Sequence, residues 1–201
     1  MKSSLRVLAL MFLFASVMVL PVKAVVIPHT NNFQPPRSTN WCWACCDYVI
    51  MNHYVSNPPS MEAIVHWIHF GHSLQCNPDN NCPYDAPLYR AAATCEARDA
   101  LNNWGIPTSL QSNGLTRTGL RSQIINGSMV WCRFGPKSGM GHAELAVGWN
   151  DGILGEKVIY FEPNDGDDHT TSWSNYSSGG FLNPNWNWTH SIFDFSRRRG
   201  E

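Results

Sequence analysis

Asn40-Trp41-Cys42-Trp43-Ala44 begins the first stretch of this chain in which apolar side chains recur at helical spacing. The pattern continues through Cys46, Val49, Ile50 and Tyr54. Ser38, Thr39 or Asn40 can supply the side-chain oxygen that caps the start of such a helix, and Asn57-Pro58-Pro59 stops it. The sequence therefore predicts a helix that begins at Asn40 and carries Cys42 in its first turn.

Further helices are expected after this one. Ser60 is the expected N-cap of a helix that runs to about Phe70 and ends at Gly71. A third helical stripe takes in Leu88, Ala92, Cys95 and Leu101 and closes at Gly105 and Pro107. A fourth, short helix covers Thr116–Ile125.

The pattern then changes to short apolar runs between turn residues, which are typical of strands. They cover Met129–Phe134, Ala143–Trp149 and Val158–Phe161. Helices first and strands later predict an α+β fold of two packed halves.

The first 24 residues have the features of an export signal. Lys2 and Arg6 precede the apolar run Val7–Leu20, and Val22-Lys23-Ala24 offers a cleavage site. The run is too short to span a bilayer. We expect a single mature domain over residues 25–201, secreted or periplasmic, with no membrane attachment.

The charge of that mature chain argues against nucleic acid as a partner. Removing three of the 14 basic residues leaves 11, against 15 acidic ones. The run Arg197-Arg198-Arg199 is interpreted as a solvated tail.

All seven cysteines lie in the mature chain, and export favours disulfides. An odd number indicates one free, reactive thiol and up to three disulfides. Cys76 and Cys82 are candidates for one local bridge. The count alone does not say which cysteine stays free.

Cys42 is the candidate nucleophile, because the first turn of a helix favours a thiolate over a thiol. His142 is the candidate base. Gly139-Met140-Gly141 delivers it to the first position of an alternating strand, where it shares a face with Glu144 and Ala146.

A base also needs a group that orients its second ring nitrogen. A hairpin reversing at Asn150-Asp151-Gly152 brings the region of Glu162, Asn164 and Asp165 level with His142. Gln34, eight residues before Cys42, is a candidate donor to an oxyanion.

These segments resemble the bacterial papain-like cysteine peptidases, in particular secreted effector-type enzymes and those that process bacteriocin leaders. The resemblance covers residues 34–166 and is carried by Gln34, Trp41-Cys42-Trp43-Ala44, Gly141-His142 with its apolar strand to Gly148, and Phe161-Glu162-Pro163. It implies a papain-like fold, with the nucleophile in a helical half and the base in an antiparallel β half. It also implies that Glu162, rather than Asn164, orients His142, although the family usually has Asp at that position.

The resemblance further implies that Gln34 is the oxyanion donor and that the reaction is peptide-bond hydrolysis through a Cys42 thioester. The substrate would be a protein or peptide, and no cofactor is expected. Two alternatives stay open: the same residues acting as an amidase or acyltransferase, and a non-catalytic binding or toxin protein with this fold. Cys45 and Cys46 replace small residues and suit disulfides or packing, which leaves Cys42 as the free thiol.

Three other patterns receive plainer interpretations, and no metal site is assigned. His66, His69 and His72 lack the arrangement of a zinc motif and are expected on a solvated helix face. Residues 164–168 lack the ligand spacing of a calcium loop and are expected to form an acidic turn. Asn126, Asn175 and Asn187 stand in glycosylation sequons.

Overall fold

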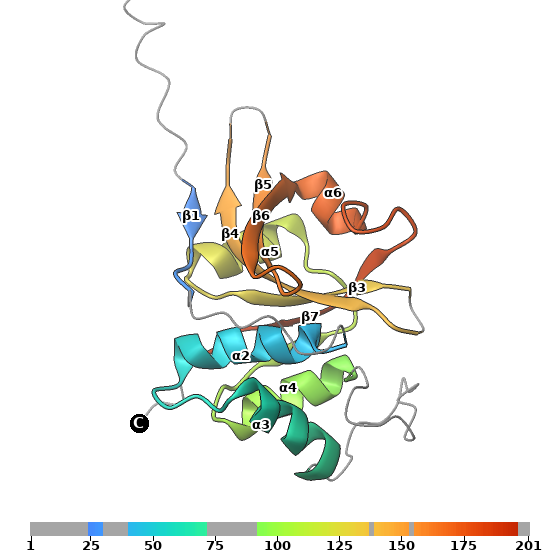
Figure 1. The fold of residues 1–201 in the computed structure, drawn as a ribbon. Coiled ribbons are helices and arrows are strands. Elements are labelled where there is room, and N and C mark those ends of the chain that lie inside the picture. Colours follow the sequence, from blue (N-terminus) through green and yellow to red (C-terminus); the bar gives the residue numbers. More distant parts are fainter. Residues whose placement is uncertain (1–23, 30–39, 72–91, 137–138, 153–154, 197–201) are drawn as a thin grey trace, which may run out of the picture.

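The computed structural model describes residues 24–29, 40–71, 92–136, 139–152 and 155–196. In that part of the chain, helices near the N-terminus pack against a seven-stranded antiparallel sheet built mainly from the C-terminal half (Figure 1). The expected α+β class is therefore confirmed. The expected export signal lies, up to residue 23, outside the described residues, as do Gln34, His72, Cys76 and Cys82.

The expected helices are present, with corrections at the first and the third of them. They are α2 (Cys42–Tyr54), α3 (Met61–His66), α4 (Thr94–Asn103) and α5 (Arg117–Ile125). Helix α4 begins after Ala93, so the expectation that Ala92 belongs to it is wrong, and Leu88 lies outside the described residues. Trp41, not Asn40, holds the N-cap position of α2, and it makes no side-chain capping bond. The expectation of an Asn40 cap is wrong, and Ser38 and Thr39 lie outside the described residues.

The caps of α3 and α5 follow the sequence. Ser60 Oγ accepts from the Ala63 N–H at 3.2 Å, and Thr116 Oγ1 accepts from the Gly119 N–H at 3.1 Å. Beyond α3 the chain continues as a π-helix, η1 (Trp67–Gly71), which ends at the expected glycine. No helix in the described ranges is long and apolar enough to cross a bilayer.

The sheet has the order β2-β7-β3-β4-β5-β6, and β1 pairs separately with β4. Its strands are β1 (Val25–Val26), β2 (Ser109–Gln111), β3 (Val130–Gly135), β4 (His142–Asn150), β5 (Lys157–Glu162), β6 (Asp167–Ser172) and β7 (Asn187–Phe193). Only β3, β4 and β5 were expected from the apolar runs.

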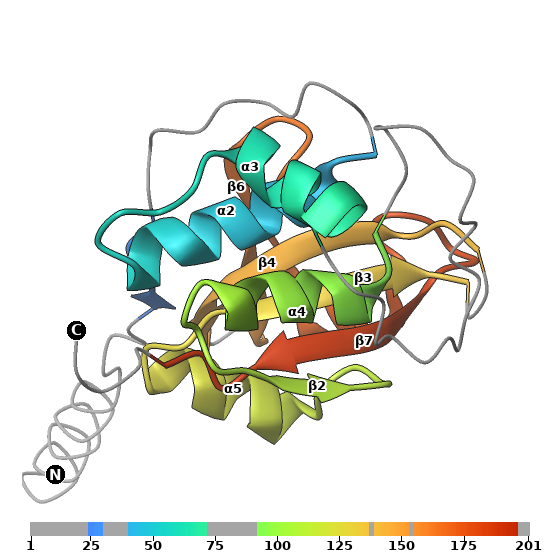
Figure 2. The same ribbon diagram turned by 90° about the horizontal axis from the view of Figure 1, so that it is seen from below.

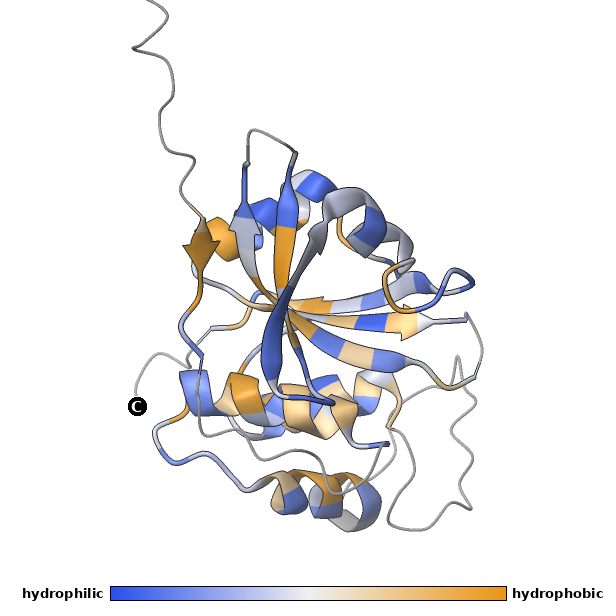
Figure 3. Ribbon diagram, turned by 45° about the horizontal axis from the view of Figure 1, so that its top comes forward, coloured by the Kyte–Doolittle hydropathy of each residue, from blue (hydrophilic) through white to orange (hydrophobic). Residues whose placement is uncertain are grey.

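The strands that sequence reasoning missed have identifiable reasons. Strand β6 lies at an edge and is almost entirely hydrophilic, so it shows no apolar alternation (Figure 3). Strand β7 and the short helix α6 (Trp173–Ser178) lie within a stretch rich in Asn, Ser and Trp. Residues 187–193 form strand β7 because they pair with β2 and β3, and not because their local sequence favours a strand.

Helices α2, α3 and α4 lie on one side of the sheet, and α5 and α6 lie on the other (Figures 1 and 2). Strand β4 runs between the two sets, and eight of its nine residues are buried. Its first half, His142–Ala146, pairs with β3. Its second half pairs with β5 and β1. The beginning of β4 therefore meets α2 in the interior of the molecule.

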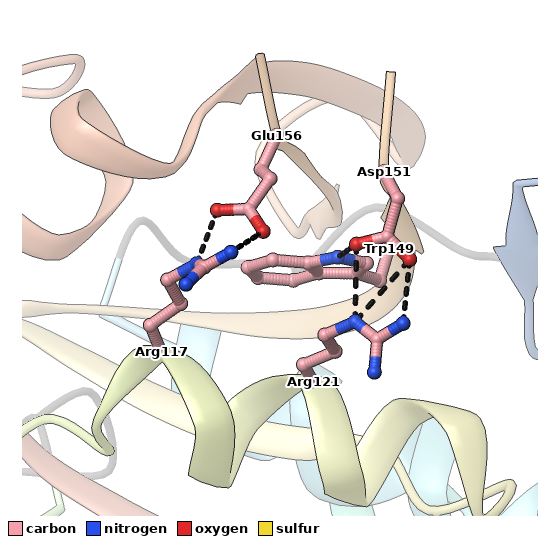
Figure 4. Close-up of polar contacts among 5 residues, drawn as sticks. All are labelled: Arg117, Arg121, Trp149, Asp151 and Glu156. Carbon is pink, nitrogen blue, oxygen red and sulfur yellow. Dashed lines mark hydrogen bonds and ion pairs between the residues drawn. The ribbon is translucent and has the colours of Figure 1, made fainter. Parts of the chain in front are cut away.

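On the far side, α5 is fixed to the β4–β5 connection by two arginine–carboxylate pairs (Figure 4). Arg121 donates from Nε and Nη2 to Asp151, with Nη2 2.7 Å from Oδ2, and Arg117 makes the same kind of pair with Glu156. Asp151 also accepts from Trp149 Nε1 at 2.7 Å. The Arg121 hydrogen bond, followed by that of Trp149, lowers the pKa of Asp151 to about 2. These contacts hold the end of β4 in place.

Candidate active site

Cys42 is the first residue of α2 and is 6 % exposed. The first intrahelical hydrogen bond runs from the Cys45 N–H to the Trp41 carbonyl at 2.9 Å. Because Trp41 provides no side-chain cap, the backbone N–H groups of this first turn point beyond the helix end. The sulfur thus lies at the positive end of the helix dipole.

His142 is the first residue of β4, and its ring is held by Glu162 at the end of β5. Nε2 donates to the Glu162 carboxylate, 2.8 Å from Oε1 and 2.9 Å from Oε2. The two side chains are 11 % and 12 % exposed. This is a short, nearly buried, charge-assisted contact.

The strand register explains why a glutamate makes this contact. Leu145 pairs with Phe161, so continuing the ladder places Glu162 beside Glu144, on a diagonal from His142. Diagonal neighbours lie farther apart than directly opposed residues, and long side chains bridge them. The side chain of Glu162, one methylene longer than that of an aspartate, suits this span.

Cys42 is the second partner of the imidazole. Since Nε2 faces Glu162, Nδ1 is the ring nitrogen left for the sulfur. Burial lowers the pKa of His142, but hydrogen bonds with Cys42 and Glu162, together with their charges, outweigh it and raise that pKa to about 10. These contacts favour the imidazolium form of the ring beside the Cys42 sulfur at the start of α2.

The other polar residues considered from the sequence lie around this contact. The Asn164 backbone N–H donates to Glu162 Oε1 at 2.9 Å, whereas its side chain is exposed. Asp165 pairs with His169 at 2.8 Å and accepts from the Asp167 N–H at 2.9 Å, which forms the acidic turn. Gln34 lies outside the described residues, so its role stays a prediction.

Glu144 is the residue at this site whose importance sequence reasoning missed. It is completely buried, and among the described residues neither carboxyl oxygen has a hydrogen-bond partner. Burial raises the pKa of Glu144 well above its usual value, opposed by the positive charge of His142. Its place two residues after His142, on the same strand face, was the available signal.

The ligand atoms of His142, Glu144 and Glu162 lie within 4.8 Å of one another. Within the described ranges, this is the one group of His, Cys, Asp and Glu side chains close enough to share a metal ion.

The thiols near the site are buried and unbridged in the described part of the chain. Cys45, Cys46 and Cys132 are fully buried, and burial raises the pKa of each. Cys42 and the partly buried Cys95 are also free thiols. Cys45 and Cys46 pack inside α2 as expected, and the proposed bridge between Cys76 and Cys82 falls outside the described residues.

Arg133 on β3 braces the hairpin that delivers His142. It donates to the carbonyl oxygens of Pro136 at 3.1 Å and Gly139 at 2.7 Å, and to Thr189 Oγ1 at 2.6 Å. Burial lowers the pKa of Arg133, while Cys42 raises it, so the guanidinium lies within electrostatic reach of the sulfur.

Two surface expectations have different outcomes. His66 is exposed as expected, but His69 is partly buried and contacts the ring of Trp43 edge-on, so a fully solvated face is wrong. The sequon residues Asn126, Asn175 and Asn187 are all exposed.

Comparison of the chain with protein-family models and with curated proteins finds no match. The interpretation of the site therefore depends on its own geometry.

Proposed function

We propose that this protein is an exported cysteine peptidase with a papain-like arrangement, in which Cys42 is the nucleophile, His142 the base and Glu162 the orienting acid. One observation carries the proposal: a thiol at a helix start and a carboxylate at the end of a strand contact the same imidazole. Acyl transfer by a cysteine requires this chain of contacts, in which the nucleophile touches a base and the base touches an orienting group.

In the proposed reaction the Cys42 sulfur attacks a peptide carbonyl carbon, and the oxyanion that forms lies at the start of α2. The Cys42 backbone N–H is one donor to that oxyanion, and the Gln34 side chain is the proposed second. His142 gives its proton to the departing amine as the C–N bond breaks. Water then hydrolyses the thioester, with His142 as the base, and frees Cys42.

The buried setting supports these roles. A thiolate next to an imidazolium needs little solvation from water, because the helix dipole and the ring supply the compensating charge. Glu162 holds the ring at Nε2 and leaves Nδ1 for the sulfur. A general base requires this, because one ring nitrogen is oriented while the other exchanges the proton.

The test is hydrolysis of an unfolded protein by the chain that begins at Val25. Cys42→Ala is expected to lower the rate by about 10³-fold or more. Cys95→Ala is the matched control, because Cys95 is a free thiol on α4 that is less buried than Cys42, and it should leave the rate unchanged.

Alkylation gives a second readout that needs no substrate. Iodoacetamide, followed by peptide mass analysis, should modify Cys42 faster than Cys95 near pH 6, although Cys42 is the more buried thiol. Equal or slower labelling of Cys42, together with full activity of Cys42→Ala, would refute the proposal.

A further inference from the structure

Glu144 poses a problem that the proposed reaction does not solve. A carboxyl group with no exposed surface and no hydrogen-bond partner is costly to bury. Its strand neighbours do not supply a partner, and neither Glu162 nor His142 is hydrogen-bonded to it. In natural proteins a bound ion or water completes many such groups.

The surroundings of Glu144 suit a cation. Glu144 and His142 project from the same face of β4, and Glu162 lies on the neighbouring strand. Their donor atoms, two carboxylate oxygens and one imidazole nitrogen, lie within 4.8 Å of one another. Ligands around a tetrahedral zinc ion lie about 3.4 Å apart, so a shift of roughly 1 Å would close this set around one ion.

We propose that His142, Glu144 and Glu162 form a binding site for a divalent cation of the Zn²⁺ type. Three protein ligands and one open position are a common zinc arrangement. Glu144 closes the inner side of the site, while His142 and Glu162 each keep about a tenth of their side-chain surface exposed and form the entrance.

The ion site stands independently of the peptidase, but its consequence rests on the proposed function. An ion on Nε2 takes the electron pair that otherwise holds the proton donated to Glu162, and this proton, together with the proton of the Glu144 carboxyl, is released to the solvent as the ion binds. His142 can then no longer be a doubly protonated cation beside the Cys42 sulfur. The same ion withdraws Glu162 from its orienting role, so the occupied site is an inhibited peptidase.

The site differs from a zinc site built on the thiol. Cys42 contacts the opposite edge of the ring, and it does not belong to the group of converging ligands. Binding should therefore survive the loss of the sulfur, which separates this proposal from zinc bound by Cys42 and His142.

The experiment measures binding of Zn²⁺ by calorimetry and of Co²⁺ by absorption spectroscopy, using Cys42→Ala and the parent chain. We expect both to bind one ion, with Co²⁺ spectra that lack the sulfur-to-cobalt charge-transfer band. In the Cys42→Ala background, Glu144→Gln should weaken binding by about 10-fold or more, because a carboxylate ligand is lost.

Asp47→Asn is the matched control. Asp47 is an equally buried carboxyl without a hydrogen-bond partner, but it lies on α2 outside the ligand group. Its substitution should leave the affinity unchanged. If Glu144→Gln does not fold, Glu162→Gln is measured in its place and must show the same loss of affinity for the ion.

Two results would overturn the ion site: unchanged affinity in the Glu144 or Glu162 variant, or a charge-transfer band that disappears with Cys42. Both are read without any substrate. Absence of peptidase activity would count against the proposed function alone, and activity that persists with the site filled would count against the inhibitory consequence alone.

Discussion

Glu162 shows how much of this site depends on the length of one side chain. Its carboxylate reaches His142 Nε2 along the diagonal between two strands, and the Asn164 N–H fixes one of its oxygens. An Asp at this position begins from the same backbone and is one methylene shorter. The glutamate is therefore the fitting residue for this register.

Glu162→Asp is accordingly expected to reduce kcat by about 10- to 100-fold, since the ring loses its orienting contact. Glu162→Gln keeps the reach and one acceptor oxygen, so it should retain more activity than Glu162→Asp. Steady-state kinetics on one peptide substrate, with KM measured separately, checks the order. A more active Asp variant would contradict the observed geometry.

Asp47 is a second residue whose setting predicts a measurable effect. It is fully buried in α2 without a hydrogen-bond partner, and burial raises its pKa well above the usual value. The folded state therefore keeps this carboxyl neutral, whereas the unfolded chain ionises it above about pH 4. Its contribution to stability is complete below that pH and declines as pH rises toward the folded pKa.

Asp47→Asn should remove this decline. The free energy of unfolding of the parent is expected to fall, relative to the variant, by up to about 1.4 kcal/mol per pH unit as pH rises above about 4, until the folded pKa is reached. Urea denaturation of both proteins at several pH values measures the difference. If the free energies of unfolding of the two proteins ran parallel across the pH range, the ionisation of Asp47 would not affect stability.

At the scale of elements, the β3–β4 hairpin positions His142 through the close approach of two strands. A Cβ atom on Gly141 would lie 2.4 Å from the Phe134 carbonyl oxygen and 2.9 Å from Arg133 Cζ. Phe134 is the strand partner of His142 itself. The glycine before the histidine therefore has a packing role as well as a place in the sequence motif.

Gly141→Ala is expected to cost about 1–3 kcal/mol of stability, because the two strands must separate. It should also lower kcat, because the displaced hairpin moves His142 relative to Cys42. Gly152→Ala is a milder comparison, since its nearest contact would be 3.1 Å and it lies at the other end of β4. Thermal unfolding of the two variants measures the loss of stability, and kinetics measures the loss of kcat. Equal losses in the two variants would contradict the special role of Gly141.

At the scale of the whole molecule, residues 25–29 tie the beginning of the described chain to its far strands. Strand β1 pairs with β4, and the Ile27 N–H donates to the Val147 carbonyl at 2.8 Å. His29 Nε2 then lies 2.9 Å from Asp168 on β6, with its ring edge-on to Phe161. This short segment crosses β4, β5 and β6.

The tie should depend on pH. The Asp168 hydrogen bond, opposed by burial and helped by the Ile27 carbonyl, raises the pKa of His29. A raised histidine pKa stabilises the fold fully below the unfolded value of about 6.5 and loses that effect as pH rises through the folded value. Hydrogen exchange of the Ile27 N–H should therefore speed up as pH rises above about 6.5, after correction for intrinsic rates.

Asp168→Asn is the control for this effect, because it removes the carboxylate and keeps the shape. Exchange of the Ile27 N–H in that variant should be faster at low pH and nearly independent of pH after the same correction. An unchanged pH dependence would assign the effect to other groups.

The sequence by itself determined the helices with strong apolar periodicity, two of their caps and the three apolar strands, and it indicated Cys42 and His142 as candidate site residues. These follow from local rules: the period of a helix or strand, Ser60 and Thr116 as caps, and a glycine-led entry to β4. Glu162 was reached with the help of family resemblance, because counting along a hairpin left Asn164 and Asp165 equally open.

Only the tertiary structure decided the rest. The register between β4 and β5, which shifts between Ala146 and Gly148, sets which polar residue reaches the imidazole. The hydrophilic edge strand β6 exists because β5 pairs with it. Glu144 looks like any polar residue in an alternating strand, and its burial appears only when α2 and the sheet enclose it. Local patterns encode neighbours along the chain, whereas desolvation and cross-strand distance depend on segments that the sequence places far apart.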